Sequence, residues 1–196
     1  MTSLHALPGE LQKIDVKIAL DAPADFDWDL LLAVFGRWRL EPDEEILDVA
    51  DYLHMPNGPG CLLVSHRWHF GVDFEDGVPG VFLSTRKGLE GELPDRFRGA
   101  IRLALEKARR LLSEPELASR VALRPTEIAV TVNDRMLIPD PVVGDEVVGP
   151  ALAATLDRLF GPSTWTRKRD ETPGARLGYK VRATTTGAVD ELIARL

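Results

Sequence analysis

Hydrophobic and polar residues alternate along several segments of the chain, as they do in half-buried strands. The longest alternation begins at Val64 within the stretch 61–75 (CLLVSHRWHFGVDFE) and predicts a strand across residues 64–74, where Val64, His66 and Trp68 share one side with the apolar residues that follow. Ser65 and His69 fall on the opposite side. The period of two predicts one long strand with one buried face. It places His66 among aromatic side chains and His69 in solvent.

Shorter stretches with the same period predict further strands. Residues 45–53 are compatible with a helix or a strand, and their β-branched residues and the turn residues that follow favour a strand. The remaining predicted strands are 11–20, with Ile14, Val16, Ile18 and Leu20 inward and Lys13, Asp15 and Lys17 outward, then 81–87, 127–133, 164–169 and 177–184.

Apolar residues at helical spacing predict four helices. The first follows the acidic cluster 25–29 and ends before Pro42, and the clearest one spans residues 94–113. A third helix is expected at 149–160 with Pro150 at its start, and a fourth at 187–196 with Thr186 as its cap.

The order strand, helix, hairpin, helix occurs twice along the chain. We therefore predict an α+β fold with two layers, a largely antiparallel sheet with helices on one face. The repeated order favours a tandem β-α-β-β-α duplication, with an extra strand in the first copy. The predicted units are 1–120 and 121–196, and one compact domain built from both is the alternative.

Composition restricts the function and location of the protein. The net charge of −7 argues against general affinity for nucleic acids or anionic membranes. Cys61 is the only cysteine, which excludes an intramolecular disulfide and a multi-cysteine zinc site. The chain has no apolar run of the roughly 18 residues that a membrane span requires and no secretory signal pattern. We expect a cytoplasmic protein without membrane association.

Residues 162–196 are a basic exception, with seven Lys or Arg residues against four Asp or Glu residues. Aromatic and basic residues on a sheet can bind single-stranded nucleic acid. In this hairpin, however, Lys180 and Arg182 alternate away from Tyr179, which favours an edge protected by charge. The sequence therefore argues against nucleic acid as a partner.

Histidines and acids between residues 48 and 69 are the candidates for a metal or catalytic site. His66 and His69 project to opposite faces of a regular strand and cannot bind one ion together. His54 could join His66 if the turn between their strands brings them close, and two histidines with a carboxylate can bind zinc or iron. The favoured interpretation is a structural His66 that is hydrogen-bonded to Asp48 or Asp51, without a cofactor.

Other candidate groups carry weaker signals. Ser65 and Cys61 lie near His66, but the chain has no G-x-S-x-G motif that would present a nucleophile. Asn133, Asp134 and Arg135 directly follow a predicted strand, where functional side chains are common, although Asn-Asp also starts turns. The candidate ligand-binding residues are Tyr52, Trp68, Asn133 and Asp134.

The segment DVADYLH (48–54), followed by Pro56, the GPG turn at 58–60, LV at 63–64 and His66, resembles an uncharacterised bacterial protein family. Members of that family carry a similar DVADY-x-H-x-P-x-GPG…LV-x-H pattern and a later N-D-R step like 133–135. The resemblance covers roughly residues 46–90 and 131–137, and this chain differs from it at Arg67 and Trp68. It implies no activity, but it groups Asp48, Asp51, His54, His66 and Arg135 as candidates.

These observations predict a small, non-catalytic binding or assembly protein. Its partner is an unidentified small molecule or protein, and a homodimer is compatible with the sequence. The alternative is an enzyme that uses His54 and His66, oriented by Asp48 or Asp51, with or without a metal.

Overall fold

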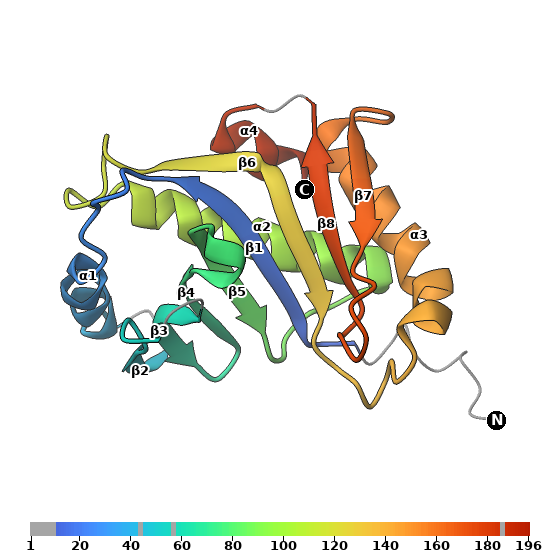
Figure 1. The fold of residues 1–196 in the computed structure, drawn as a ribbon, viewed down its shortest axis with the longest axis horizontal. Helices are drawn as coiled ribbons and strands as arrows, with labels where there is room; N and C mark the ends of the chain where they lie inside the picture. Colours follow the sequence, from blue (N-terminus) through green and yellow to red (C-terminus); the bar gives the residue numbers. More distant parts are fainter. Residues whose placement is uncertain (1–10, 43–44, 56–57, 185–186) are drawn as a thin grey trace.

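Residues 11–42, 45–55, 58–184 and 187–196 are the part of the chain that the computed structural model describes, and they form a two-layer α+β fold (Figure 1). Eight antiparallel strands make one sheet. This confirms the predicted fold class. The strands are β1 (Ile14–Asp21), β2 (Ile46–Asp51), β3 (Pro59–Ser65), β4 (Trp68–Asp73), β5 (Gly80–Thr85), β6 (Ala122–Val132), β7 (Trp165–Arg169) and β8 (Gly178–Ala183).

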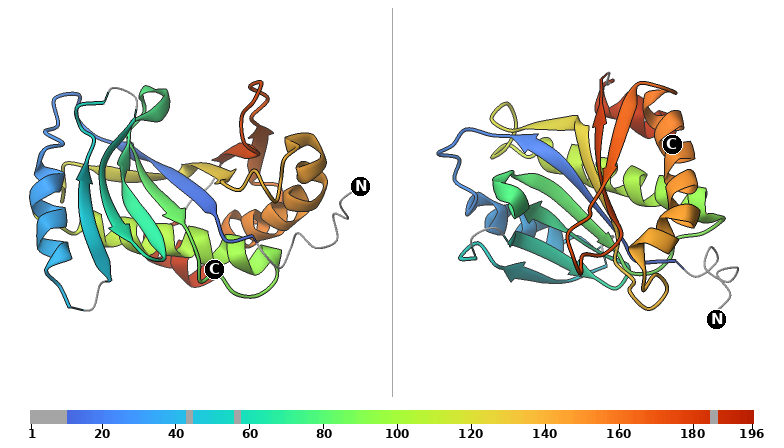
Figure 2. Two further views of the ribbon diagram at one scale, coloured as in Figure 1. Left: turned by 90° about the horizontal axis from the view of Figure 1, so that it is seen from below. Right: turned by 45° about the vertical axis from the view of Figure 1, so that its right-hand side comes forward.

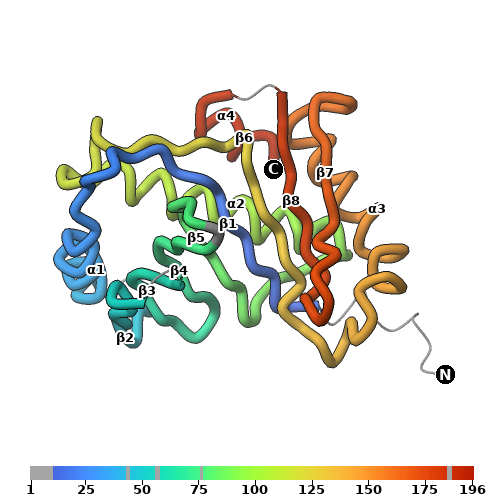
Figure 3. The backbone as a smooth tube through the Cα atoms, in the orientation of Figure 1, coloured from blue at the N-terminus to red at the C-terminus, as the bar shows by residue number. Residues whose placement is uncertain are grey.

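The strand order in the sheet is β2-β3-β4-β5-β1-β6-β8-β7. β1 and β6 lie side by side near the middle (Figure 3), with Ile14 opposite Val132. This pairing joins the two units predicted at 1–120 and 121–196 in one sheet. β5 is beside β1 as β8 is beside β6, an order that a tandem duplication also produces. The duplication itself stays a prediction.

The helices α1 (Leu30–Arg39), α2 (Leu93–Leu112), α3 (Pro141–Phe160) and α4 (Val189–Arg195) cover one face of the sheet (Figure 2). α2 lies against β1 and β5, and α1 lies against β2 and β3. α2 begins with a capping box, in which the Glu92 backbone N–H donates to the Asp95 carboxylate at 3.0 Å.

Apolar side chains between the helices and the sheet form the core. The aromatic rings of Phe35 and Trp38 from α1 contact Phe70 from β4, with ring centroids 6.1 and 6.3 Å apart. The predicted apolar stripe of α2 is buried at the positions that face the sheet, namely Phe97, Ala100, Ile101, Ala104, Leu105, Ala108 and Leu111.

The prediction of one long strand across residues 64–74 is wrong. β3 and β4 are separate strands joined by a tight hairpin turn. The turn residues are His66 and Arg67, and both are exposed. The buried Ser65 hydroxyl accepts hydrogen bonds from the backbone N–H groups of Arg67 (3.2 Å) and Trp68 (3.1 Å). His66 is therefore in solvent rather than among aromatic side chains.

The third helix is longer than predicted. α3 begins at Pro141 instead of residue 149, and Pro150 lies inside it. The Asp140 carboxylate caps the helix by accepting from the Val142 N–H at 2.8 Å. The strand favoured at 45–53 is confirmed as β2. Thr186, the predicted cap of the last helix, lies outside the described residues.

Candidate functional site

The face of the sheet opposite the helices carries polar side chains from the central strands. β1 shows why, because Ile14, Val16 and Ile18 point into the core and the intervening Asp15 and Lys17 point to the other face. Two connections rise above this open face in Figure 2: the β4–β5 turn, which includes the 3₁₀ helix Glu75–Gly77, and the β7–β8 loop.

The open face is hollowed between these two connections. Cavities of about 460 and 290 Å³ adjoin there, and both are lined by Lys17, Glu75, Ala129, Thr131 and Arg176. We call the two cavities together the open-face groove. The larger cavity adds lining residues from β8 and its loop, and the smaller one adds Asp15, Asp73 and residues of β3 and β5.

Small side chains form the floor of the groove. In the sheet register Thr131 lies between Asp15 and Gly178, and Ala129 lies beside Lys17. A Cβ atom at Gly178 would lie 3.0 Å from the Thr131 hydroxyl oxygen. Larger residues at these positions would therefore fill the space between the two connections.

Asp15 is the central buried charge of this site, with only 7% of its surface exposed. Its carboxylate accepts hydrogen bonds from Asn133 Nδ2 at 3.3 Å and from Arg176 Nη1 at 3.4 Å, and from the Ser84 hydroxyl. Burial raises the pKa of the Asp15 carboxyl, because the hydrogen bonds and nearby arginines compensate only part of the lost hydration.

Lys17 connects β1 to the β4–β5 turn. Its ammonium group forms an ion pair with Asp73 and donates to the Glu75 carbonyl oxygen at 2.8 Å. Both side chains of the ion pair are largely buried. The contact therefore holds one wall of the groove against the central strand.

The opposite wall is the β7–β8 loop. The Arg135 guanidinium donates from Nη2 to the Gly174 carbonyl oxygen at 2.9 Å. Asp170 accepts from the Thr172 N–H at 2.9 Å, and bonds to the hydroxyl and N–H of Thr172 lower the pKa of its carboxyl. These bonds order the loop that carries Arg176.

His69, Ser84 and Asp15 lie in one row across β4, β5 and β1. They are the residue types of a hydrolase triad, but in a different order, because the Ser84 hydroxyl donates to Asp15 rather than to a histidine. Burial, followed by the nearby Arg86 charge, lowers the pKa of His69. The row therefore lacks the serine–histidine contact of a hydrolase triad.

The structure does not bring His54 and His66 together. Asp51 pairs with Cys61 at one end of the β2–β3 ladder, next to His54, and Ile46 pairs with Ser65 at the other end. A strand rises about 3.3 Å per residue, which separates the two ends by roughly 15 Å. Both histidines are exposed, and no group of three metal-ligating side chains occurs within the described residues.

The acids proposed with these histidines lie at the β2 edge. Asp48 is exposed and lies 4.0 Å from Arg39. Asp51 accepts from the Leu53 N–H at 3.0 Å, a local turn contact. Tyr52 is exposed beside this edge, and Trp68 is buried on the helix side, where the Lys107 ammonium lies 4.3 Å from its ring centroid.

The predicted step Asn133-Asp134-Arg135 does contribute to the open-face groove. Asn133 donates to Asp15, and Arg135 lines the larger cavity. Asp134 instead forms a turn by accepting from the Met136 N–H at 3.1 Å, and it lies 3.4 Å from Lys13. Of the five residues grouped by the family resemblance, only Arg135 lines the groove.

Sequence reasoning missed Asp15, Lys17, Thr131 and Arg176 as site residues. The alternation of residues 11–20 correctly placed Asp15 and Lys17 on the polar face, but a polar face is normally solvated. The available signal was an acid and a lysine within a strand whose other residues are strongly apolar. Such a strand belongs to the centre of a sheet, where its polar positions are most enclosed.

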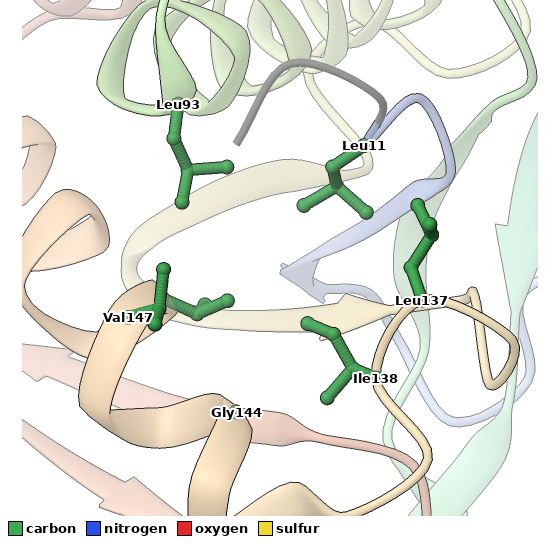
Figure 4. A pocket seen from close by; sticks show the side chains of 7 residues that line it. Leu11, Leu93, Leu137, Ile138, Gly144 and Val147 are labelled. Carbon is green, nitrogen blue, oxygen red and sulfur yellow. The ribbon is translucent and has the colours of Figure 1, made fainter. Parts of the chain in front are cut away.

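Two other features of the described residues offer no comparable site. An apolar pocket between α2 and α3 is lined by Leu93, Ile138 and Val147 among others (Figure 4), but its volume of about 10 Å³ holds one water molecule at most. Cys61 is buried, and burial raises the pKa of its thiol to about 12, so it is a poor nucleophile.

Comparison of the sequence with models of known protein families finds no match, and comparison with curated proteins finds no significant relative. The resemblance to an uncharacterised bacterial family thus stays a prediction. Among the described residues, none of the four helices is both long enough and apolar enough to span a bilayer.

Proposed function

We propose that the protein is a non-catalytic binding module whose site is the open-face groove, and that its ligand is a small charged molecule. The observation that carries this proposal is the buried Asp15 carboxyl in the groove, beside the Arg176 guanidinium. The groove also has the size of a small-molecule site, since such sites usually measure about 300–1,000 Å³.

The energetics of Asp15 support a functional role. A carboxyl whose pKa is raised by burial destabilises the folded protein at neutral pH, where the group is ionised in the unfolded chain. An uncharged residue at this position would avoid that penalty. Titratable groups with a shifted pKa that face a cavity are candidates for functional sites. A bound ligand can supply the charge or hydrogen bonds that replace the hydration lost on burial.

The chemistry of the groove favours binding over catalysis. The Ser84 hydroxyl donates to Asp15, and Lys17 is paired with Asp73. The described residues that line the groove include no histidine, serine or cysteine, so the groove lacks the Ser–His or Cys–His pair of a nucleophilic enzyme. The enzyme alternative around His54 and His66 has no geometric support, because those residues lie at opposite ends of a strand pair.

A groove-filling substitution tests the proposal. The probes are four small molecules of different charge: succinate, inorganic phosphate, glycine and 1,4-diaminobutane. We expect at least one of them to shift the backbone amide NMR signals of groove residues saturably. Ala129→Phe should abolish that binding, because its ring occupies the floor between Lys17 and Thr131.

The matched control is Ala33→Phe, which adds the same ring at an exposed position of α1. It should bind the probe as the wild-type protein does. Binding that survives in Ala129→Phe, or groove signals that respond to none of the four probes, would contradict a ligand site in the groove.

A further inference from the structure

The open-face groove is divided by charge. Six charged side chains line the larger cavity, four basic and two acidic, whereas five line the smaller one, two basic and three acidic. The basic residues of the larger cavity are Lys17, Arg135, Arg176 and Lys180, and its acids are Glu75 and Asp170. The three acids of the smaller cavity are Asp15, Asp73 and Glu75.

We infer that the larger cavity is an anion subsite, in which Arg135 and Arg176 bind a carboxylate or phosphate group of the ligand. This inference rests on the proposed function, because it assigns ligand chemistry to one half of the same groove. The acidic half then faces the remainder of the ligand, which is neutral or cationic.

The two arginines keep donors for a ligand. Arg176 contacts Asp15 through Nη1 at 3.4 Å, longer than a strong charge-assisted hydrogen bond. Arg135 uses Nη2 for the Gly174 carbonyl oxygen. A guanidinium group has five N–H donors in a planar fork, so each side chain can also form a bidentate contact with a carboxylate or phosphate.

The acids of the larger cavity do not neutralise these arginines. Asp170 is turned to its own loop, where it accepts hydrogen bonds from Thr172. Glu75 lies across the groove on the β4–β5 turn and not on the β7–β8 loop.

The net charge of the whole chain disfavours anion binding outside the larger cavity. A protein with a net charge of −7 repels anions at long range, so an anion gains little from general attraction to its surface. Anion binding should therefore depend on the few side chains that converge in the groove.

The test is an NMR titration of the full chain with inorganic phosphate and with succinate, at constant ionic strength maintained with sodium chloride. We expect saturable shifts of the amide signals of Thr131, Ala175 and Gly178 with at least one anion. Arg176→Gln and Arg135→Gln should each weaken this binding roughly tenfold or more, as expected for loss of a hydrogen bond between charged groups.

Arg109→Gln is the matched control, because Arg109 is an exposed α2 arginine that pairs with Asp190 outside the groove. It should leave the affinity unchanged. Arg135 is exposed, so its glutamine variant is expected to fold and keeps the test valid if Arg176→Gln unfolds the protein.

The remaining outcomes separate this inference from the proposed function. Groove shifts with 1,4-diaminobutane but with neither anion would overturn the anion subsite and leave the groove a binding site. Equal anion affinity in Arg135→Gln and wild type would also overturn the subsite. A groove that responds to neither anion, nor to the diamine or glycine, would contradict both proposals.

Discussion

Asp15 is a buried carboxyl whose environment disfavours its charged form. Its neighbours Asn133 and Arg176 lie at 3.3 and 3.4 Å, at the long end of the hydrogen-bond range. Burial therefore outweighs the stabilisation of the charged form and raises the pKa of the carboxyl above its ordinary value of 3.8. A bound cation or hydrogen-bond donor would reduce that penalty.

The Asp15→Asn variant tests whether the pKa of Asp15 is raised in the folded protein, because such a shift makes the free energy of unfolding depend on pH. The folded carboxyl keeps its proton to a higher pH than the unfolded one, so the stability that Asp15 contributes is complete below pH 3.8. That contribution is lost as the pH rises through the raised pKa of the folded state. We expect the free energy of unfolding of Asp15→Asn to increase relative to wild type as the pH rises through this range.

Urea denaturation at a series of pH values from acidic to neutral measures the difference. Asp25→Asn, at an exposed position before α1, is the control and should follow the wild-type pH dependence. Parallel curves for Asp15→Asn and wild type would mean that Asp15 titrates alike in the folded and unfolded states.

At the scale of elements, the sequence pattern predicted most strands and helices, because the burial period of each element is local. The apolar stripe of α2 and the alternation of β1 follow directly from residue spacing. The β3–β4 hairpin escaped prediction because two-residue hairpin turns usually carry Gly, Asn or Asp, and this one carries His66 and Arg67. The hydroxyl of Ser65 supplies the turn contacts instead.

Ser65→Ala should accordingly destabilise the protein by about 1–2 kcal/mol, since it removes the acceptor of two backbone N–H groups at a buried position. Chemical denaturation monitored by tryptophan fluorescence measures the change. Ser113→Ala, which loses one exposed hydroxyl contact with the Arg110 carbonyl oxygen, should cost less than about 0.5 kcal/mol. Equal losses in both variants would show that the Ser65 contacts do not hold the hairpin.

At the scale of the whole molecule, the open-face groove belongs to both predicted units. β1 and the β4–β5 turn come from residues 1–120, and β6, β8 and the β7–β8 loop come from residues 121–196. Only the pairing of β1 with β6 brings Lys17 beside Ala129. The sequence could indicate Asn133 and Arg135 from their place after a strand, and it held a signal for Asp15 in the apolar residues around it. It could not show that Asp15 lies beside Arg176, because long-range strand pairing carries no local signal.

The most direct test of the groove as the binding site is an isotope-filtered NOE experiment on the protein bound to whichever of succinate, glycine and 1,4-diaminobutane binds saturably. We predict NOEs from the methylene protons of that probe to the methyl groups of Ala129 and Thr131, which both cavities share. Saturable binding of the probe with NOEs only to residues outside the groove would contradict the groove as the binding site.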